Sequence, residues 1–304
     1  MTKHTIIQGN CKEVLKKLED NSIHLVVTSP PYNVGLEYDV YNDKQDWGVY
    51  FEQMEEIIKE MKRILVEGGR ICWNVQINVR RKEEDRVNLM QRFKNIFDKY
   101  FVDMGDIVWI EETMTKRTAW GSWCSPSSPY IQMPLECVLV YAKNSKKLEG
   151  QETDLKKDEF MDWVTGIWKF NNNTLNESHV ASFPSELPKR CIKLFSWVGN
   201  TILDPFAGSG TTLLVARELN RNSIGIELSE NYCRRIKEKL GYGQQQIDKQ
   251  EVEYEILTAV ENTQNLGDFG LLSQTRLISV KRDVATSPNS PHDLSTIKEE
   301  ANFS

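Results

Sequence analysis

Two short stretches of the sequence combine residue types that could do chemistry. The first, TSPPYN at residues 28–33, follows the apolar run 23–27. Proline has no backbone N–H and forces the preceding residue out of the helical region, so carbonyl oxygens in this stretch are left free at the end of a strand. Ser29, the carbonyl of Pro30 and the ring of Tyr32 would then offer hydrogen-bond acceptors and a flat aromatic surface. A simple turn would have a similar composition, so this stretch alone leaves both interpretations open.

The second stretch, DPFAGSGTT at residues 204–212, lies between a short predicted strand and a predicted helix. Its glycines let backbone N–H groups approach a ligand, and a helix N-terminus favours anionic groups. It lacks the lysine of a P-loop and is not a complete G-x-G-x-x-G. Glu227 closes the next predicted strand, 23 residues after Asp204, where an acid can accept hydrogen bonds from ribose hydroxyls. This combination favours a nucleoside-bearing cofactor over an ordinary strand–helix turn.

Hydrophobic periodicity predicts the elements that position both stretches. The predicted strands lie near residues 5–8, 23–27, 70–75, 107–110, 136–142, 201–203 and 223–226. The predicted helices lie near 48–65, 86–100, 185–197, 211–219 and 229–240, after a short first helix with Val14, Leu15 and Leu18 on one face. Gly68 and Gly69 are expected to end the long helix. The alternation predicts an α/β fold, with a Rossmann-like, mostly parallel sheet covered by helices on both faces.

The same alternation defines the predicted domains. Residues 1–243 form one catalytic domain, interrupted at 144–178 by a polar segment in which Trp163 and Trp168 are the expected anchors. Residues 244–304 are Gln-rich and then contain Ser, Thr and Pro, so we expect an acidic, polar C-terminal tail. A folded appendage in this region is the alternative.

Composition bounds the class of protein. The chain of 304 residues is 39% hydrophobic and 27% charged, which is typical of a globular protein. No apolar run approaches the ~18 residues of a membrane span, and the N-terminus lacks the apolar core of a signal peptide. The six cysteines are scattered without a C-x-x-C pair, which indicates neither a zinc site nor a disulfide framework. We therefore expect a reduced, cytoplasmic protein without a bound metal ion or membrane contact.

The net charge of −6 argues against a protein that coats nucleic acid electrostatically, but the charge is uneven. Residues 244–304 hold 5 Lys and Arg against 10 Asp and Glu, or −5, which leaves −1 for the rest of the chain. Within that nearly neutral body, residues 113–147 hold five basic residues against one acid, Glu136. Such a basic strip is compatible with binding a polyanion.

The two stretches together resemble the motifs of a known family. DPFAGSGT is similar to the S-adenosylmethionine loop of the DNA amino-methyltransferases, and TSPPY resembles their catalytic motif. The catalytic motif comes first, with 175 residues from Ser29 to Asp204, an order that resembles the circularly permuted beta group. The resemblance covers roughly residues 4–240. It implies a class I methyltransferase fold that begins at the third strand of the sheet, S-adenosyl-L-methionine as cofactor and duplex DNA as substrate.

The resemblance carries over to individual positions. It implies catalytic roles for Ser29, Pro30, Pro31 and Tyr32. It implies cofactor contacts for Asn10, Cys11, Phe183, Asp204, Pro205, Phe206, Gly208, Ser209, Gly210, Thr211 and Glu227. Asn10 stands where the family usually has an aspartate near the adenine of the cofactor, and Phe183 would lie beside the methionine part.

This chemistry explains the residues of the first stretch. An exocyclic amine is a poor nucleophile because its lone pair is delocalised into the ring. Ser29 Oγ and the Pro30 carbonyl could accept both N–H bonds, which draws the nitrogen toward tetrahedral geometry and points its lone pair at the sulfonium methyl group. The base must first leave the duplex, and Tyr32 offers a face on which it can stack.

The resemblance also bears on the target base. Ser29 stands where adenine-N6 enzymes of the family more typically have aspartate, which favours the N4 amine of cytosine, with adenine N6 as the alternative. An RNA base, a protein glutamine amide, or an idle DNA-binding subunit are further alternatives. A cytosine-C5 enzyme is disfavoured because it needs a cysteine nucleophile after proline, and the sequence has no Pro-Cys pair. The expected setting is restriction–modification, with a cognate restriction endonuclease as a partner, and an orphan methyltransferase is the alternative.

DNA contacts are expected in the connection at residues 115–130. Basic and aromatic side chains together suit a strand-separated nucleotide and its phosphates, whereas a solvated hairpin with packing tryptophans is the alternative. The candidates are Lys116, Arg117, Trp120 and Trp123. The segment at 144–178 is the candidate for target recognition, from its place in the order of motifs.

Overall fold

The structure is a computed structural model of the chain and describes residues 2–36, 43–81, 86–111, 122, 124–129, 135–171 and 183–241, with the backbone of 252–258 and 278–279. Its strands are β1 (Thr2–Gln8), β2 (Ile23–Thr28), β3 (Leu65–Gln76), β4 (Asn78–Val79), β5 (Val87–Asn88), β6 (Val102–Ile110), β7 (Leu135–Ala142), β8 (Ile167–Lys169), β9 (Thr201–Asp204), β10 (Asn222–Glu227), β11 (Val252–Thr258) and β12 (Ile278–Ser279). Its helices are α1 (Cys11–Leu15), α2 (Trp47–Ile64), α3 (Leu89–Phe97), α4 (Lys157–Trp163), α5 (Glu186–Phe195), α6 (Thr211–Glu218) and α7 (Glu230–Lys239). No helix in these ranges is long and apolar enough to cross a membrane.

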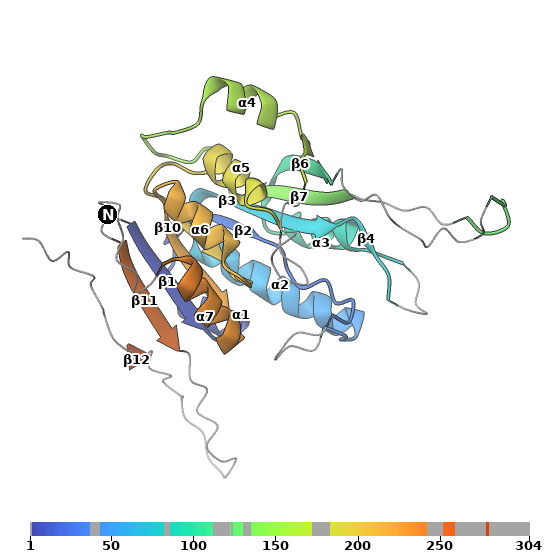
Figure 1. Ribbon diagram of the computed structural model, residues 1–304, viewed down its shortest axis with the longest axis horizontal. Coiled ribbons are helices and arrows are strands. Elements are labelled where there is room, and N and C mark those ends of the chain that lie inside the picture. The colour runs from blue at the N-terminus through green and yellow to red at the C-terminus, as the bar shows by residue number, and fades with distance from the viewer. Residues whose placement is uncertain are drawn as a thin grey trace, which may run out of the picture.

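One ten-stranded sheet organises the fold, beside a small sheet of β4 and β5 (Figure 1). The strand order is β12-β11-β1-β10-β9-β2-β3-β7-β6-β8. Neighbouring strands from β11 to β3 are parallel, whereas β7 runs antiparallel between β3 and β6. This topology confirms the predicted α/β fold with a mostly parallel sheet. Because the parallel strands end at one edge, the residues that follow β1, β10, β9 and β2 are brought together there.

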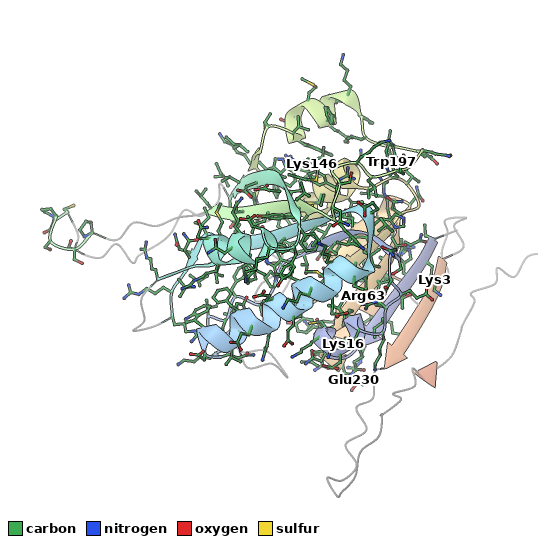
Figure 2. The ribbon with its side chains drawn as sticks, turned by 180° about the vertical axis from the view of Figure 1, so that it is seen from behind. Lys3, Lys16, Arg63, Lys146, Trp197 and Glu230 are labelled. Atoms are coloured by element: carbon green, nitrogen blue, oxygen red, sulfur yellow. The ribbon has the colours of Figure 1, made fainter. Side chains whose placement is uncertain are left out.

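Two hydrophobic clusters cover the two faces of the sheet. On one face, Trp73 of β3 packs against Phe93 of α3, with ring centroids 5.2 Å apart, and α2 adds residues such as Met54. On the other face, Cys72 of β3 lies in a cluster with α5 and α6 residues that include Cys191. Adjacent strand residues point to opposite faces, so Cys72 and Trp73 divide between the clusters. In Figure 1 α5 and α6 lie in front of the sheet, and α2 comes to the front in the reverse view of Figure 2.

Arg63 of α2, labelled in Figure 2, ties this helix to the end of α1. Its guanidinium group donates to the carbonyl oxygens of Leu15 at 2.7 Å and Leu18 at 2.9 Å. The last carbonyl groups of a helix lack partners within the helix, and Arg63 satisfies that of Leu15 together with that of Leu18 in the turn after α1. The short α1, which follows β1 directly, is thereby held against α2.

The prediction that Gly68 and Gly69 end α2 is wrong, since α2 ends at Ile64 and both glycines lie inside β3. Gly68 has a left-handed φ of +70°, and a Cβ there would lie 1.8 Å from the Lys147 carbonyl oxygen. Gly68 N also donates to the Lys143 carbonyl at 3.0 Å. Gly68 therefore allows β3 to come close to the chain that follows β7, so its role lies in tertiary packing and not in ending a helix.

The segment from 144 to 171, where the periodicity predicted no regular elements, contains α4 and β8. Both are short, and β8 adds to the edge of the sheet beside β6. Trp168 Nε1 donates to the Trp163 carbonyl at 2.9 Å, and the Arg190 guanidinium lies 5.3 Å and 5.5 Å from the ring centroids of Trp163 and Trp168. Both tryptophans are buried, which agrees with their expected role as anchors.

The last strands extend the sheet beyond the predicted catalytic domain. β11 pairs in parallel with β1 along its whole length, from Val252 opposite Thr2 to Thr258 opposite Gln8. The predicted domain boundary at residue 243 therefore lies between two strands of one sheet. Part of the predicted tail belongs to that sheet, as in the alternative of a folded appendage.

We expect Gly68→Ala to lower the free energy of unfolding more than Gly199→Ala does. The two glycines have left-handed φ values of +70° and +80°. This conformation costs a residue with a Cβ about 1–2 kcal/mol. A Cβ at Gly199 meets nothing within 4 Å, so that variant measures the backbone cost alone, whereas Gly68 faces the backbone of Lys147. Urea unfolding of both variants measures the difference; equal losses would show that β3 can move away from Lys147.

Candidate active site at the carboxyl edge of the sheet

A buried carboxylate, Asp204, joins the two stretches that could do chemistry. It ends β9 and is 2% exposed. Asp204 Oδ1 accepts from Thr28 Oγ1 at 2.6 Å and from Phe206 N at 3.1 Å, and Oδ2 accepts from Thr212 Oγ1 at 2.7 Å. Thr28 ends β2 immediately before Ser29, and Thr212 lies in the first turn of α6. Asp204 therefore holds the start of TSPPY against the glycine turn, with both of its oxygens engaged by the protein.

The glycine turn follows a left-handed path between β9 and α6. Gly208 and Gly210 have φ values of +49° and +78°, and Gly210 is the N-cap of α6. A Cβ on Gly210 would come within 2.9 Å of the Ile236 side chain, so the turn packs closely against α7. Glu227, at the end of β10, accepts from Gly208 N and from Ser229 N, each at 2.8 Å. Glu227 thus lies beside the glycine turn, as its spacing predicts, and burial raises the pKa of its carboxyl.

The end of β1 lies next to Glu227. β1 pairs with β10, and Gly9 N donates to the Glu227 carbonyl oxygen at 2.9 Å. Asn10 is exposed and caps α1 by accepting from Lys12 N at 3.0 Å. Cys11 is the first residue of α1, and burial raises the pKa of its thiol to about 12. The neutral thiol of Cys11 and the exposed amide of Asn10 therefore lie just after β1, which β10 separates from β9 and its glycine turn.

The other predicted cofactor residues lie in the turn itself and before α5. Pro205, Phe206, Ser209 and Thr211 belong to the glycine turn and the first position of α6. Phe183 precedes α5 and packs against the cluster that contains Val27 and Val215. The predicted residues after β1, β9 and β10 thus meet at one edge of the sheet, and their individual contacts with the cofactor stay predictions.

The catalytic stretch runs along the same edge after β2. Ser29 Oγ donates to Tyr32 OH at 2.9 Å and lies 3.2 Å from a backbone carbonyl oxygen of β3. The Pro31 carbonyl accepts from Tyr50 OH at 2.7 Å. No hydrogen bond between described residues uses the Pro30 carbonyl. The two prolines therefore differ: within the described part of the chain the Pro30 carbonyl oxygen has no donor, whereas Tyr50 of α2 donates to the Pro31 carbonyl oxygen.

Two polar residues that the sequence analysis did not assign complete this arrangement. Tyr32 OH donates to Glu136 Oε2 at 3.2 Å, and Asn74 Nδ2 donates to the same oxygen. Glu136 lies opposite Gln76 in the register of β3 and β7. Burial raises the pKa of the Glu136 carboxyl, and it raises the pKa of the Tyr32 hydroxyl well above its ordinary value. The sequence offered one signal for each of the two unassigned residues. Asn74 is a polar residue inside the predicted strand 70–75, and Glu136 is the single acid of the basic strip.

A third unassigned residue, Asp43, holds the chain that follows Tyr32. Its carboxylate, 2% exposed, accepts from the backbone N–H groups of Asn33, Val34, Gly35 and Leu36 at 2.8 to 3.1 Å. Four successive N–H groups pointing at one carboxylate fix a turn that has no regular secondary structure. This contact joins residues 7 to 10 positions apart, which no local pattern predicts.

The four predicted DNA-binding residues, Lys116, Arg117, Trp120 and Trp123, lie outside the described residues. Their neighbours locate the connection to which they belong. β6 ends at Ile110 and β7 begins at Leu135, next to Glu136. The connection therefore leaves and re-enters the sheet at the edge that carries the catalytic stretch.

The strand order, the antiparallel β7 and the glycine turn after β9 define the class I methyltransferase fold, entered at its third strand. The N6_N4_Mtase family, described as DNA methylase, matches residues 23–238. The chain belongs to this family and is an S-adenosylmethionine-dependent DNA methyltransferase that acts on an amino group. This confirms the family, the fold, the cofactor and DNA methylation as predicted from the motifs.

Curated relatives and solved structures agree with this assignment. The chain is 29% identical to the type II methyltransferase M.MjaI of Methanocaldococcus jannaschii, over 81% of this chain and 94% of that one. It is 35% identical to M.MjaVI of the same organism, over 53% and 82%. The putative DNA modification methylase TTHA0409 of Thermus thermophilus, complexed with S-adenosyl-L-methionine, has a TM-score of 0.65 at 27% identity, over 83% and 99%. The cytosine-N4-specific PvuII DNA methyltransferase shares the fold, with a TM-score of 0.63 at 19% identity over 82% and 89%.

Asp204→Asn tests the buried carboxyl through its pH dependence. Burial raises the pKa of Asp204 from 3.8 to about 6, so the folded chain holds this proton more tightly than the unfolded chain does. The resulting stability is present below about pH 4 and is lost as the pH rises through about 6. We expect the free energy of unfolding of the wild type, relative to the variant, to fall by up to about 3 kcal/mol between those limits. Denaturant unfolding at several pH values measures this; a difference independent of pH would contradict the assignment.

Proposed function

We propose that the chain transfers the methyl group of S-adenosyl-L-methionine to the exocyclic N4 amine of cytosine in duplex DNA. One observation carries the proposal. The bridge from Thr28 through Asp204 to Thr212 places Ser29 against the turn predicted to hold the cofactor. Direct transfer requires the amine and the methyl donor to be neighbours in line, and this bridge supplies that proximity.

The donor set fits the cofactor. Glu227 offers carboxylate oxygens at the end of β10, where ribose hydroxyls can donate to them. Gly208 leaves room for a ligand to approach the backbone closely, because a Cβ there would meet nothing nearer than the Phe206 carbonyl oxygen at 3.9 Å. Bound there, the cofactor would supply an electrophilic methyl group on a sulfonium centre.

The residues of TSPPY prepare the amine. Ser29 Oγ and the Pro30 carbonyl are the acceptors for the two N–H bonds, which localises the lone pair on the nitrogen. Tyr32 provides the surface on which the flipped base stacks. Its hydroxyl is held between Ser29 and Glu136, so the ring is oriented before the base arrives.

Cytosine is favoured over adenine because Ser29 takes the place of the aspartate that is more typical of adenine-N6 enzymes of the family. Adenine N6 is the alternative, since both bases present an amine beside a ring nitrogen. The membership in a family of DNA methylases removes RNA, a protein amide and an idle subunit from the earlier alternatives.

The relatives named type II methyltransferases support a restriction–modification role. We propose in addition that the chain works in the cytoplasm, alongside a cognate endonuclease. For target recognition, residues 144–178 are proposed. Their described part presents exposed apolar side chains on α4, of which Phe160 is 47% and Met161 61% exposed. Lys116, Arg117, Trp120 and Trp123 are proposed to contact the DNA beside the flipped base.

The product identifies the target base. We expect N4-methylcytosine when the protein is incubated with methyl-labelled S-adenosylmethionine and unmethylated genomic DNA of mixed sequence. Nucleosides from the digested DNA are identified by mass spectrometry. N6-methyladenine would contradict the choice of cytosine, and no labelled nucleoside would contradict the proposed activity.

Glu227→Gln should weaken cofactor binding by about 10- to 100-fold, because a hydrogen bond to a charged group contributes about 1.5–3 kcal/mol. Glu230→Gln is the matched control, since Glu230 lies three positions away with its side chain 76% exposed. Calorimetry with S-adenosylmethionine measures both dissociation constants. Equal constants for the two variants would refute the role of Glu227.

A further inference from the structure

Glu136 is a carboxylate near the proposed amine site, where the proposed function gives it only the role of orienting Tyr32. β7 runs antiparallel to β3, so its first residues lie at the edge where the parallel strands end. Glu136 stands opposite Gln76 of β3 and Trp109 of β6 in the sheet register. On β3 it also reaches Asn74, whose amide donates to it. The carboxylate is thus held by its neighbours on the sheet, with its Oε2 directed toward TSPPY.

A chain of hydrogen bonds leads from the amine site to this carboxylate. Ser29 Oγ donates to Tyr32 OH at 2.9 Å, and Tyr32 OH donates to Glu136 Oε2 at 3.2 Å. With these two bonds, each hydroxyl gives its hydrogen in the direction of Glu136. The Asn74 carbonyl oxygen, 3.2 Å from Ser29 Oγ, is the other acceptor that the serine hydrogen reaches. Ser29 Oγ keeps its lone pairs for a donor on its other side, which is where the proposed function places the amine.

The transfer needs a proton acceptor. Methyl transfer forms an N–C bond as the C–S bond of the cofactor breaks, and the electron pair of that bond returns to sulfur. The nitrogen then carries a positive charge and one proton more than the neutral product. A serine hydroxyl is too weak a base to keep this proton, so it must be passed on.

We propose that Glu136 is the final acceptor of this proton, which moves along Ser29 and Tyr32. The amine gives its proton to Ser29 Oγ, Ser29 passes its own hydrogen to Tyr32, and Tyr32 passes its own to Glu136 Oε2. The products are the neutral methylated amine and a protonated Glu136 carboxyl, which returns the proton to solvent between turnovers. The proposal rests on the proposed function, because it assumes an amine beside Ser29.

The surroundings of Glu136 suit an acceptor. Among the residues that the structure describes, the titratable groups that face it are Tyr32 and the carboxylate of Glu111, while Asn74 and Gln76 offer neutral amides. Burial raises the pKa of Glu136 most, the hydrogen bonds from Asn74 and Tyr32 lower it, and the charge of Glu111 raises it again. The net pKa is raised, which makes Glu136 a stronger base than an exposed glutamate. The pKa of Tyr32 is raised well above its ordinary value, so Tyr32 passes a proton on without staying ionised.

Glu136→Gln tests the relay because glutamine keeps the size and one acceptor oxygen but cannot take the proton. We expect the single-turnover rate of methyl transfer at pH 8 to fall by about 10²- to 10⁴-fold. The ratio of wild-type to variant rate should shrink toward one as the pH falls, because Glu136 of the wild type then becomes protonated. Asp204 and Glu227 titrate in both proteins, so they cancel in this ratio.

A merely structural role for Glu136 predicts a ratio that is constant with pH, and that result would overturn the proposal. Glu111→Gln removes the neighbouring charge and should move the pH dependence of the ratio to lower pH. Tyr32→Phe keeps the ring but breaks the relay, and should lose rate as Glu136→Gln does. It therefore serves as the second variant if Glu136→Gln fails to fold.

The substrate for these rates is the duplex DNA in which the product analysis detects methylation. Dissociation constants for S-adenosylmethionine and for this DNA should stay within about twofold of the wild type, which separates proton transfer from binding. Wild-type methylation with a pH-independent ratio would refute the relay alone. Absence of methylation by the wild type would refute the proposed function and the relay with it.

Discussion

The site depends on the buried carboxylate of Asp204, which accepts hydrogen bonds from the hydroxyl groups of Thr28 and Thr212. β9 and β2 are neighbours in the sheet, but only two residue pairs join them, Leu25 with Ile202 and Val26 with Leu203. Backbone pairing between β2 and β9 therefore stops before Thr28 and Asp204. A side-chain hydrogen bond between these two residues holds the ends of the two strands together. Burial makes the charged carboxylate costly, which the raised pKa of Asp204 reflects, and it also strengthens each hydrogen bond that the carboxylate accepts.

The antiparallel β7 gives this edge a second source of polar groups. In an all-parallel sheet, only residues that follow strands would reach the site. Because β7 begins where β3 ends, Glu136 meets Tyr32 across 104 positions of the sequence. The site thus combines a loop after β2, a side chain inside β3 and the first residues of β7, each with a separate structural cause.

The permuted order of the chain leaves this arrangement unchanged. The catalytic stretch precedes the glycine turn in sequence, yet β2 and β9 lie side by side in the sheet. What the chemistry requires is the adjacency of strand ends, and sheet pairing determines that adjacency whatever the order of the strands along the chain. β11 shows the same independence, since it pairs with β1 although it comes from the far end of the described chain.

Local patterns in the sequence were enough to predict the alternation of strands and helices, the glycine turn with Glu227, and TSPPY at the end of a strand. These signals are local, because periodicity, proline and glycine act on neighbouring residues. Gly68 was wrongly predicted to end a helix. A glycine is needed there because the backbone of Lys147 comes close, which no local pattern shows. The assembly of Asp204 with Thr28, and of Tyr32 with Glu136, was decided by the tertiary structure alone. Sheet register and burial bring these groups within hydrogen-bonding distance, and both depend on residues far apart in the chain.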